Sequence, residues 1–385
     1  MIGEGKIEMK LKSKRVWIGG TFLPATLQIE NGKIAAVLGY DEPGAEDWAN
    51  NRVVPGFIDV HTHGAYGAMA NYCREEELKL WTSKLPDEGV TAYLPTTFTE
   101  EPDNIAAACE RIANVMEGGP AGAEILGIHL EGPFLSIEYK GAMNPERIIP
   151  FDATLFDRWQ QAARGHVRYI TIAPEQDQGY RFTQYAAQQG VVVSIGHSAA
   201  TYQQALYALG NGARCFTHAF NAMKPLNHRE PGCVGALMRS DAYTELIFDG
   251  HHVSMDVIQI LFRTKGRDRI VGVSDSLSLK AAAPGEYSLD GRALVINDDG
   301  AAFLKGTTTL AGSTLMYNRG LKLLVETAEV PISWALAALS ENPARLLGLD
   351  DRLGYIRAGY DADLVVLGDD YQVVQTYCKG KASKA

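Results

Sequence analysis

The stretch VVPGFIDVHTHG, residues 53–64, decides the fold that we predict for this chain. Its apolar run ends in the letters DVHTHG, which is typical of a buried strand followed by a turn. Side chains two residues apart on a strand point to the same side, so His61 and His63 project together from the strand end. Two imidazoles in this arrangement can bind one ion, although such a pair also occurs as hydrogen-bonded core histidines. The Pro55-Gly56 pair marks a joint between two units of the chain.

Composition narrows the class of protein. With 385 residues, 46% hydrophobic and 21% charged, the chain can bury a large core. The formal net charge of -10 argues against nucleic-acid binding, but a local field can still favour an anionic small substrate. Five scattered cysteines without a Cys-x-x-Cys motif predict reduced thiols. Because we find neither a signal-peptide core nor a run long enough to span a membrane, we expect a cytoplasmic protein without membrane contact.

The two ends of the chain share a β pattern that the middle lacks. Residues 1–54 alternate polar and apolar residues, with Asn31-Gly32 as a hairpin turn, and residues 354–381 have the same character. We therefore expect a small β-sandwich domain built from residues 1–54 and 354–385. Residues 55–353 would then form the catalytic domain.

The middle of the chain alternates short apolar runs with amphipathic stretches of helical spacing. One such stretch, residues 101–118, begins with acidic residues and ends at glycine, as a capped helix does. The same plan predicts helices at residues 153–165, 180–190, 201–212 and 254–266. The apolar runs cover residues 56–63, 90–96, 124–132, 167–175, 191–197, 213–220, 244–252 and 269–276. Eight strands alternating with helices predict an α/β fold, a (β/α)8 TIM-type barrel, with a doubly wound sheet as the weaker alternative. Residues 279–312 interrupt the pattern and predict a hairpin insertion, with turns at Pro284-Gly285, Asp290-Gly291 and Asp299-Gly300.

Active sites of such barrels lie at the C-terminal ends of the strands. The residues at these ends that can bind a metal or transfer a proton are His61, His63, Glu131, His197, His218, His251, His252 and Asp275. Imidazole and carboxylate groups suit zinc or another divalent transition metal, which lowers the pKa of a bound water. Asp275 could take a proton from that water and deliver it to a leaving nitrogen. The pattern predicts a metal-assisted hydrolase.

Some of these residues have plainer interpretations. His129 lies deeper on the strand that ends in Glu131, which favours a core or supporting role over that of a ligand. His251 and His252 are adjacent, so only one of them faces the site. Asp275 could instead cap the following segment, but its place at a barrel strand end favours catalysis.

A second cluster, NAMKPLNHREPG at residues 221–232, suits an anionic substrate. Asn221, the backbone of Ala222 and the Arg229 guanidinium are groups that bind phosphate, although an ordinary loop with a surface arginine explains them equally well. LAGST at residues 310–314 is a turn of small residues that would let a sugar approach the backbone, or that merely begins a helix.

Taken together, these motifs carry a family resemblance. PGFIDVHTHG, HLEGPF, GHS, THAFNAM, REPG, DGHHV, VSDS and LAGS follow one another as in N-acetylglucosamine-6-phosphate deacetylases of the amidohydrolase superfamily. AGYDADLVVL, residues 358–367, is similar to the segment with which amidohydrolases return to their small β domain. The chain resembles this family over nearly its whole length.

The resemblance implies roles for individual residues. Glu131, His197 and His218 correspond to the primary metal ligands, and His61 and His63 to a second metal site that some members lack. We therefore expect one or two divalent ions, Zn2+ first and Fe2+, Co2+ or Mn2+ as alternatives. Asp275 corresponds to the catalytic acid and base. The implied substrate-binding residues are Ala142, Met143, Asn221, Ala222, Arg229, His252, Leu310, Ala311 and Gly312.

Two further expectations follow from the resemblance. Arg229 corresponds to a residue that reaches the substrate phosphate in the neighbouring subunit, which implies a homodimer. Met143 stands where the family often has histidine or another hydrogen-bonding residue near the acetyl carbonyl. A thioether cannot polarise a carbonyl as a donor would, which leaves the preferred acyl group or sugar open.

The expected reaction is hydrolysis of N-acetylglucosamine 6-phosphate to glucosamine 6-phosphate and acetate. A deacetylase of another amino-sugar phosphate, such as N-acetylgalactosamine 6-phosphate, is the nearest alternative. A dihydroorotase-like hydrolase of cyclic amides is disfavoured because residues 167–175 contain no lysine that could bridge two metals. A non-enzymatic barrel is disfavoured because the ligand set is complete.

Overall fold

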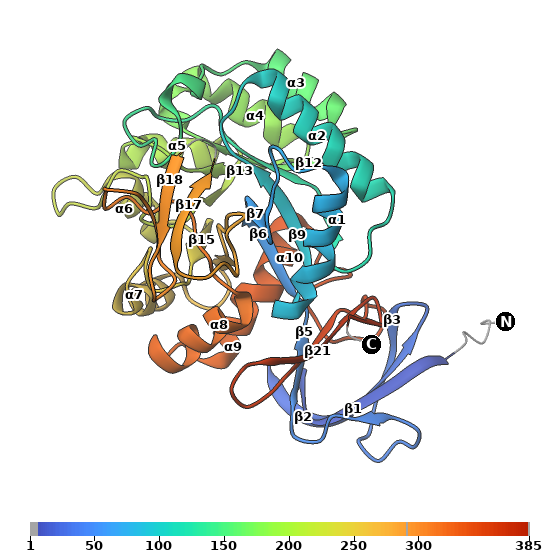
Figure 1. Ribbon diagram of the computed structural model, residues 1–385. Coiled ribbons are helices and arrows are strands. Elements are labelled where there is room, and N and C mark those ends of the chain that lie inside the picture. Colours follow the sequence, from blue (N-terminus) through green and yellow to red (C-terminus); the bar gives the residue numbers. More distant parts are fainter. Residues whose placement is uncertain (1–6, 290–291, 384–385) are drawn as a thin grey trace.

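A parallel barrel forms the centre of the computed structural model, which describes residues 7–289 and 292–383 (Figure 1). Its strands are β6 (Phe57–Thr62), β9 (Val90–Thr97), β11 (Ile128–Glu131), β12 (Val167–Ile172), β13 (Val192–Ile195), β14 (Ala213–Phe216), β15 (Tyr243–Ile247) and β16 (Ile270–Val273). Each strand pairs in parallel with the next one along the chain. This order confirms the predicted barrel and excludes the doubly wound sheet, in which the strand order reverses.

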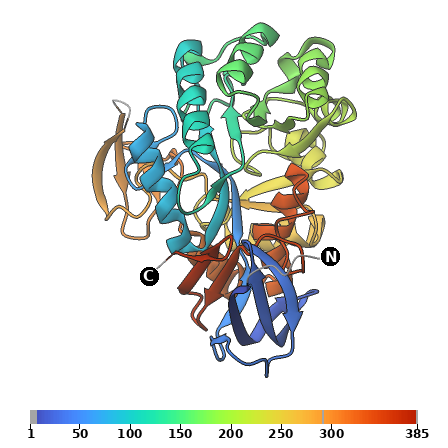
Figure 2. The same ribbon diagram turned by 90° about the vertical axis from the view of Figure 1, so that its right-hand side faces the viewer.

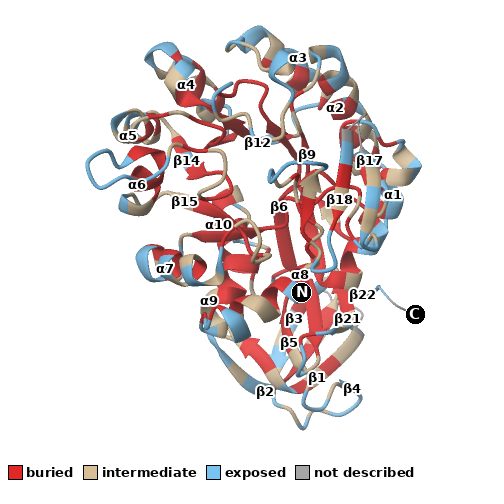
Figure 3. Ribbon diagram, turned by 60° about the vertical axis from the view of Figure 1, so that its left-hand side comes forward, coloured by how far each residue is buried: buried red, intermediate tan, exposed pale blue. Residues whose placement is uncertain are grey.

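Helices surround the barrel and cover its outer face (Figure 3). The five helices predicted between the strands are α2 (Pro102–Glu117), α3 (Ala153–Ala162), α4 (Arg181–Gln188), α5 (Tyr202–Gly210) and α7 (Met255–Lys265). Their ends follow local chemistry: the Asp152 side chain accepts hydrogen bonds from the first turn of α3, and Thr201 forms a capping box with Gln204 at α5. The sequence pattern missed α1 (Glu75–Lys84) and α6 (Gly232–Arg239).

The last helical segments complete the outer layer. They are α8 (Tyr317–Lys322), α9 (Ile332–Leu336) and α10 (Asn342–Leu347), with π-helical turns at Leu323–Thr327 and Ala337–Glu341. Single 3-10 turns lie at Leu85–Glu88, Pro145–Arg147, Pro174–Gln176 and Gln178–Tyr180. Among the described residues, we find no helix whose length and apolar character would let it cross a membrane.

Side-chain and backbone contacts join the first barrel strand to the last. Asp59 on β6 accepts hydrogen bonds from the backbone N of Ser274 (3.2 Å) and from its hydroxyl (2.5 Å). The backbone N of Asp275 donates to the carbonyl of His61 (2.9 Å). The Tyr317 hydroxyl lies 2.7 Å from the carbonyl of Gly272 on β16 and 3.2 Å from that of Ile58 on β6. These contacts close the barrel and bring the end of β16 beside the histidines of β6.

Both ends of the chain combine into one β unit, as predicted (Figures 1 and 2). Its strands are β1 (Ile7–Ile18), β2 (Thr21–Glu30), β3 (Lys33–Leu38), β4 (Glu46–Asp47), β5 (Arg52–Pro55), β20 (Leu364–Leu367), β21 (Val373–Cys378) and β22 (Lys381–Ala382). They hydrogen-bond into one continuous sheet rather than two separate ones, and the two ends meet where β5 pairs with β20. Asn31 and Gly32 both have positive φ at the β2–β3 turn, as the hairpin prediction required.

The insertion after the last barrel strand is a three-stranded antiparallel sheet beside the barrel (Figure 2). Its strands are β17 (Gly285–Leu289), β18 (Arg292–Ile296) and β19 (Ala302–Leu304), and the predicted turn at Asp290-Gly291 lies outside the described residues. Leu294 of β18 packs with Met69, Leu277 and Ala311 in a small apolar cluster. The remaining short strands are β7 (Gly64–Ala65), β8 (Ala68–Met69) and β10 (Glu124–Ile125).

Candidate metal and substrate site

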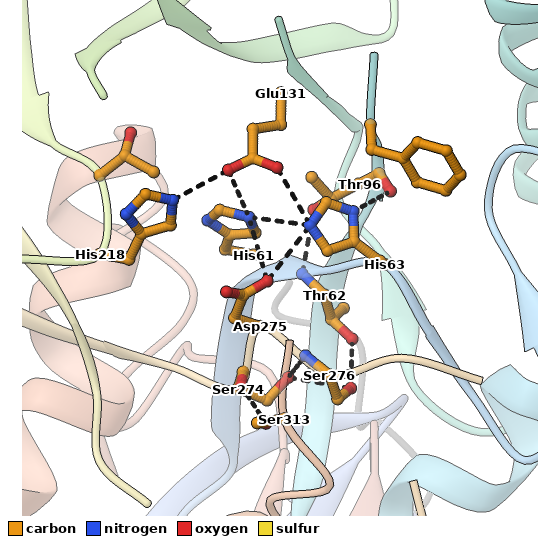
Figure 4. A network of polar contacts seen from close by, with 12 residues as sticks. His61, Thr62, His63, Thr96, Glu131, His218, Ser274, Asp275, Ser276 and Ser313 are labelled. Carbon is orange, nitrogen blue, oxygen red and sulfur yellow. Dashed lines mark hydrogen bonds and ion pairs between the residues drawn. The ribbon is translucent and has the colours of Figure 1, made fainter. Parts of the chain in front are cut away.

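A first group of ligand atoms surrounds Glu131 at the end of β11, and Figure 4 shows Glu131 and His218 of this group. Its Oε1 lies 3.0 Å from Nε2 of His218 and 3.2 Å from Nε2 of His197. The two imidazole nitrogens lie 3.2 Å from each other. All three side chains are buried. Their ligand atoms are close enough to share one ion.

A second group lies on the other side of the same glutamate. Nε2 of His61 and Nε2 of His63 are 3.4 Å apart, and Oδ1 of Asp275 lies 3.2 Å from the latter. Oε2 of Glu131 is also 3.2 Å from Nε2 of His63. The Glu131 carboxylate therefore stands between the two groups. Its Oε2 faces the second group, and its Oε1 faces the first group but also lies 3.5 Å from Nε2 of His61.

Hydrogen bonds behind the imidazoles make both groups suitable for a cation. Nδ1 of His197 donates to the carbonyl of Tyr139 (2.9 Å), and Nδ1 of His63 donates to the carbonyl of Thr96 (3.1 Å). A carbonyl can only accept, so each Nδ1 carries a proton, and each Nε2 is the nitrogen that offers a lone pair when an ion displaces its proton. Neutral imidazole nitrogens together with a carboxylate are the donor set of zinc and related divalent metals. The residues present fit such an ion.

The electrostatics of the cluster favour positive charge. Burial lowers the pKa of His61 and of His63, but the carboxylates around them outweigh it and raise these values to about 9 and about 10. Burial raises the pKa of Asp275, but the hydrogen bond with His63 and the charges of both histidines lower it to about 2. Asp275 is therefore an ionised carboxylate at neutral pH.

The backbone is strained where three of these residues leave their strands. His197 (φ 48°), His218 (φ 27°) and Asp275 (φ 48°) all have positive φ, which is uncommon for residues with a side chain. Such conformations persist only when the surrounding structure imposes them, and they concentrate at functional sites. The left-handed turn at each strand end directs the side chain across the barrel mouth.

A cavity of about 720 Å³ lies above the cluster. Eight expected substrate-binding residues line it, namely Ala142, Met143, Asn221, Ala222, His252, Leu310, Ala311 and Gly312. Arg229 is exposed and is not among the lining residues of its own chain. His252 faces the cavity while His251 points to Asp299, with its Nε2 3.3 Å from that residue's carbonyl.

A comparison with known families agrees with this arrangement. The model of the amidohydrolase family matches residues 52–383. The chain belongs to the amidohydrolase family. Amidohydrolases depend on divalent metals, which agrees with the donor groups of the cluster.

Similar proteins specify the branch of this family. An N-acetylglucosamine-6-phosphate deacetylase of Bacillus subtilis (strain 168) is 38% identical over 341 residues, which cover 86% of this amidohydrolase and 84% of the relative. An N-acetylgalactosamine-6-phosphate deacetylase of Escherichia coli O157:H7 is 34% identical over 360 residues, which cover 92% of this chain and 93% of the relative. A solved structure of the Mycobacterium smegmatis N-acetyl-D-glucosamine-6-phosphate deacetylase is also similar, with a TM-score of 0.92 and 32% identity over 98% of this chain and 99% of the other. It is an aspartate-to-alanine mutant in complex with N-acetyl-D-glucosamine-6-phosphate. The resemblance inferred from the motifs is confirmed.

Sequence reasoning missed several residues of this amidohydrolase site. Glu245 is fully buried on β15, and its Oε2 lies 2.8 Å from Nδ1 of His61. The sequence did offer one sign of this residue, because a charged side chain inside the apolar run TELIF would be buried and would need a partner. Lys140 and Arg147 line the cavity on the loop that follows β11, and their sequence context contains no motif that marks them.

His129 occupies a different place from the ligand groups. It is fully buried below them, with Nδ1 3.1 Å from the carbonyl of Val60 and Nε2 2.9 Å from the hydroxyl of Thr171. Burial and the charge of His61 lower its pKa well below the ordinary value. Both ring nitrogens are thus engaged, and His129 supports the floor of the site.

Proposed function

We propose that this amidohydrolase hydrolyses the N-acetyl group of N-acetylglucosamine 6-phosphate to give glucosamine 6-phosphate and acetate. The observation that carries the proposal is the convergence of Glu131, His197 and His218 with the ionised Asp275 at the floor of one cavity. Two relatives, from Bacillus subtilis and Mycobacterium smegmatis, match this chain over most of their length, and both are N-acetylglucosamine-6-phosphate deacetylases.

Glu131, His197 and His218 would hold one divalent ion, for which Zn2+ is our first choice. His61 and His63 would hold a second. When bound, a divalent cation supplies an activated water and polarises the amide carbonyl. Nδ1–H donation from His63 and His197 to fixed carbonyls keeps the opposite nitrogens turned toward the site.

Asp275 acts as the catalytic base and acid. Its carboxylate is ionised at neutral pH, so it can accept a proton from the attacking water. As the C–N bond breaks, it returns that proton to the departing nitrogen, and the amine leaves as a neutral group. The strained backbone at Asp275 holds Oδ1 toward the two histidines throughout.

The walls of the cavity would select the substrate. Asn221, Ala222 and His252 would bind the phosphorylated side of the sugar, while Leu310–Gly312 would face the ring. Met143 would lie near the acyl group, on a loop that is fixed through the hydrogen bond between Tyr139 and His197. A thioether wall admits the acetyl methyl without adding a hydrogen bond to the carbonyl.

We further propose a cytoplasmic homodimer in which Arg229 serves the neighbouring active site. The exposure of Arg229 outside the cavity of its own chain supports this arrangement. An exposed guanidinium on a loop can form a bidentate contact with a phosphate presented by a second chain. Five free cysteines agree with a reducing compartment.

N-acetylgalactosamine 6-phosphate is the competing substrate, because a relative that covers 92% of the chain carries that name. The test is a side-by-side assay of zinc-loaded protein with both phosphorylated N-acetylhexosamines and with unphosphorylated N-acetylglucosamine. We expect the highest kcat/KM for N-acetylglucosamine 6-phosphate. Loss of the phosphate should lower kcat/KM by about 10- to 100-fold, as expected for charge-assisted hydrogen bonds. Equal kcat/KM values for phosphorylated and unphosphorylated N-acetylglucosamine would contradict the phosphate-binding roles proposed for Asn221 and Arg229.

A further inference from the structure

Glu245 on β15 links both ligand groups from below. Its Oε2 lies 2.8 Å from Nδ1 of His61 and accepts a hydrogen bond from the backbone N of His218 (3.2 Å). Its Oε1 accepts a hydrogen bond from the hydroxyl of Tyr169 (2.5 Å). The side chain is fully buried. One carboxylate therefore touches a residue of each ligand group and nothing in solvent.

The geometry separates Glu245 from the ligands themselves. It meets His61 at Nδ1, the nitrogen that points away from the cluster, whereas Nε2 of His61 lies 3.4 Å from Nε2 of His63 and 3.5 Å from Glu131. Glu245, His61 and His129 are close enough to be considered a third ion site. However, both nitrogens of His129 are already bonded to Val60 and Thr171. This group is therefore a hydrogen-bonded support.

We propose that Glu245 is a positioning residue that holds His61 with its proton on Nδ1, so that the lone pair on Nε2 faces the ion site. The two oxygens of Glu245 already accept hydrogen bonds from the backbone N of His218 and from the Tyr169 hydroxyl. His61 is therefore the donor in the remaining contact. A carboxylate behind a metal-binding histidine fixes the tautomer and the ring plane and strengthens the ligand. This inference rests on the proposed metal-dependent function and deepens it.

Two substitutions test whether Glu245 acts as the hydrogen-bond acceptor of His61 or only fills the space beside it. Glu245→Met keeps similar bulk but offers His61 no oxygen. Glu245→Gln can keep its carbonyl oxygen on His61 while its amide donates to the hydroxyl of Tyr169. Methionine should therefore weaken metal binding more than glutamine does. Tyr169→Phe is the matched control, since it removes the contact on Oε1 and leaves that with His61.

The experiment measures zinc affinity by titrating metal-stripped protein against a chromophoric chelator, with thermal unfolding as a check of the fold. We expect Glu245→Met to lower the affinity for the zinc ion that His61 helps to bind by about 10- to 100-fold. Tyr169→Phe should bind zinc as the wild type does. In a His61→Ala background, Glu245→Met should cause no further loss, because the histidine that it positions is absent.

Wild-type affinity in Glu245→Met, or an equal loss with and without His61, would overturn the proposal. If the methionine variant does not fold, 15N spectra of the histidines in the zinc-loaded wild type still test the proposal, because zinc bound at Nδ1 of His61 instead of Nε2 would contradict it. The titration uses no substrate, so an incorrect substrate assignment would leave its result unchanged. A wild-type chain that binds no zinc would instead overturn the metal-dependent function, and the role of Glu245 with it.

Discussion

Oδ1 of Asp275 lies 3.2 Å from Nε2 of His63, so the last strand of the barrel meets the first at the candidate metal site (Figure 4). The hydrogen bonds from Ser274 to Asp59 and from Asp275 to His61 hold this seam together. The position of the carboxylate that we propose to be catalytic is therefore set by closure of the barrel. A loop that was free to move could not keep it there.

Replacing Asp275 by asparagine should abolish turnover while leaving the fold intact. The amide has nearly the same shape as the carboxylate but cannot accept a proton and return it. Loss of general acid–base catalysis lowers kcat by about 100- to 10,000-fold. Steady-state kinetics, with zinc content and thermal unfolding as controls, would check this. Substantial activity in a folded, metal-loaded Asp275→Asn variant would contradict the role of this residue.

His61→Ala and His63→Ala should each reduce the zinc content without emptying the site. Glu131, His197 and His218 form a complete ligand group of their own, so one tightly held ion should remain. Elemental analysis of purified variants measures this directly. Glu131→Gln is the informative contrast, because its two oxygens face both groups and its loss should weaken both. Complete loss of zinc in His61→Ala would show that the two groups bind as one site.

Much of the barrel and of the ligand set could be predicted because both depend on local patterns. A buried parallel strand is a continuous apolar run, and the residue at its C-terminal end faces the barrel mouth. That rule selected His197, His218 and Asp275 from sequence position alone. The β character of the two ends likewise predicted that they combine, because strands with exposed edges need partners.

Contacts between distant segments could not be predicted in the same way. Glu245 lies within an apolar run, and its partners Tyr169 and His61 come from two other strands. The hydrogen bond between Asp59 and Ser274 could not be predicted for the same reason, because no motif around either residue indicates that the other is its partner. Such pairs depend on the register and closure of the barrel, which hydrophobic periodicity does not determine.

Asp249→Asn should affect binding of a phosphorylated substrate more than chemistry. Oδ2 of Asp249 lies 2.7 Å from Nδ1 of His252, while its Oδ1 accepts hydrogen bonds from the backbone N of His251 and of His252. Burial lowers the pKa of His252, but this contact outweighs it and raises the pKa above its ordinary value. His252 thus keeps its charge to higher pH and presents a positive donor to the cavity.

For Asp249→Asn we expect KM to rise by about 10- to 100-fold with a smaller change in kcat, since a charge-assisted contact to the ground state is weakened. The pH at which KM begins to rise should also move down, because His252 then loses its proton earlier. KM and kcat measured across the pH range check both effects. A fall in kcat at unchanged KM would instead place His252 in the chemical step.

Asp363→Asn should remove a pH-dependent instability of the fold. Asp363 is buried beside a cavity of about 800 Å³ between the barrel and the terminal sheet, and its Oδ1 accepts a hydrogen bond from the backbone N of Lys379 (2.7 Å). Among the described residues its Oδ2 has no hydrogen-bond partner. Burial raises the pKa of this carboxyl to about 7, despite the opposing hydrogen bond from Lys379.

The sign of the effect follows from proton binding. Between the ordinary carboxyl pKa and about 7, the folded chain binds this proton and the unfolded chain does not, so the free energy of unfolding falls as pH rises. Asparagine does not titrate, so the variant should gain stability relative to the wild type by on the order of 1 kcal/mol per pH unit across this window. Urea unfolding of both proteins at several pH values measures the difference.

Asp361→Asn provides a control of opposite sign two residues away. Burial raises the pKa of Asp361, but its contacts with Lys33 and Arg352 outweigh this and lower the pKa below the ordinary value. Its contribution to stability is therefore present above the ordinary carboxyl pKa and is lost as pH falls through the lowered one. Asp361→Asn should thus lose stability at neutral pH, where Asp363→Asn gains it. A stability difference between wild type and Asp363→Asn that does not vary with pH would show that this carboxyl titrates normally in the fold.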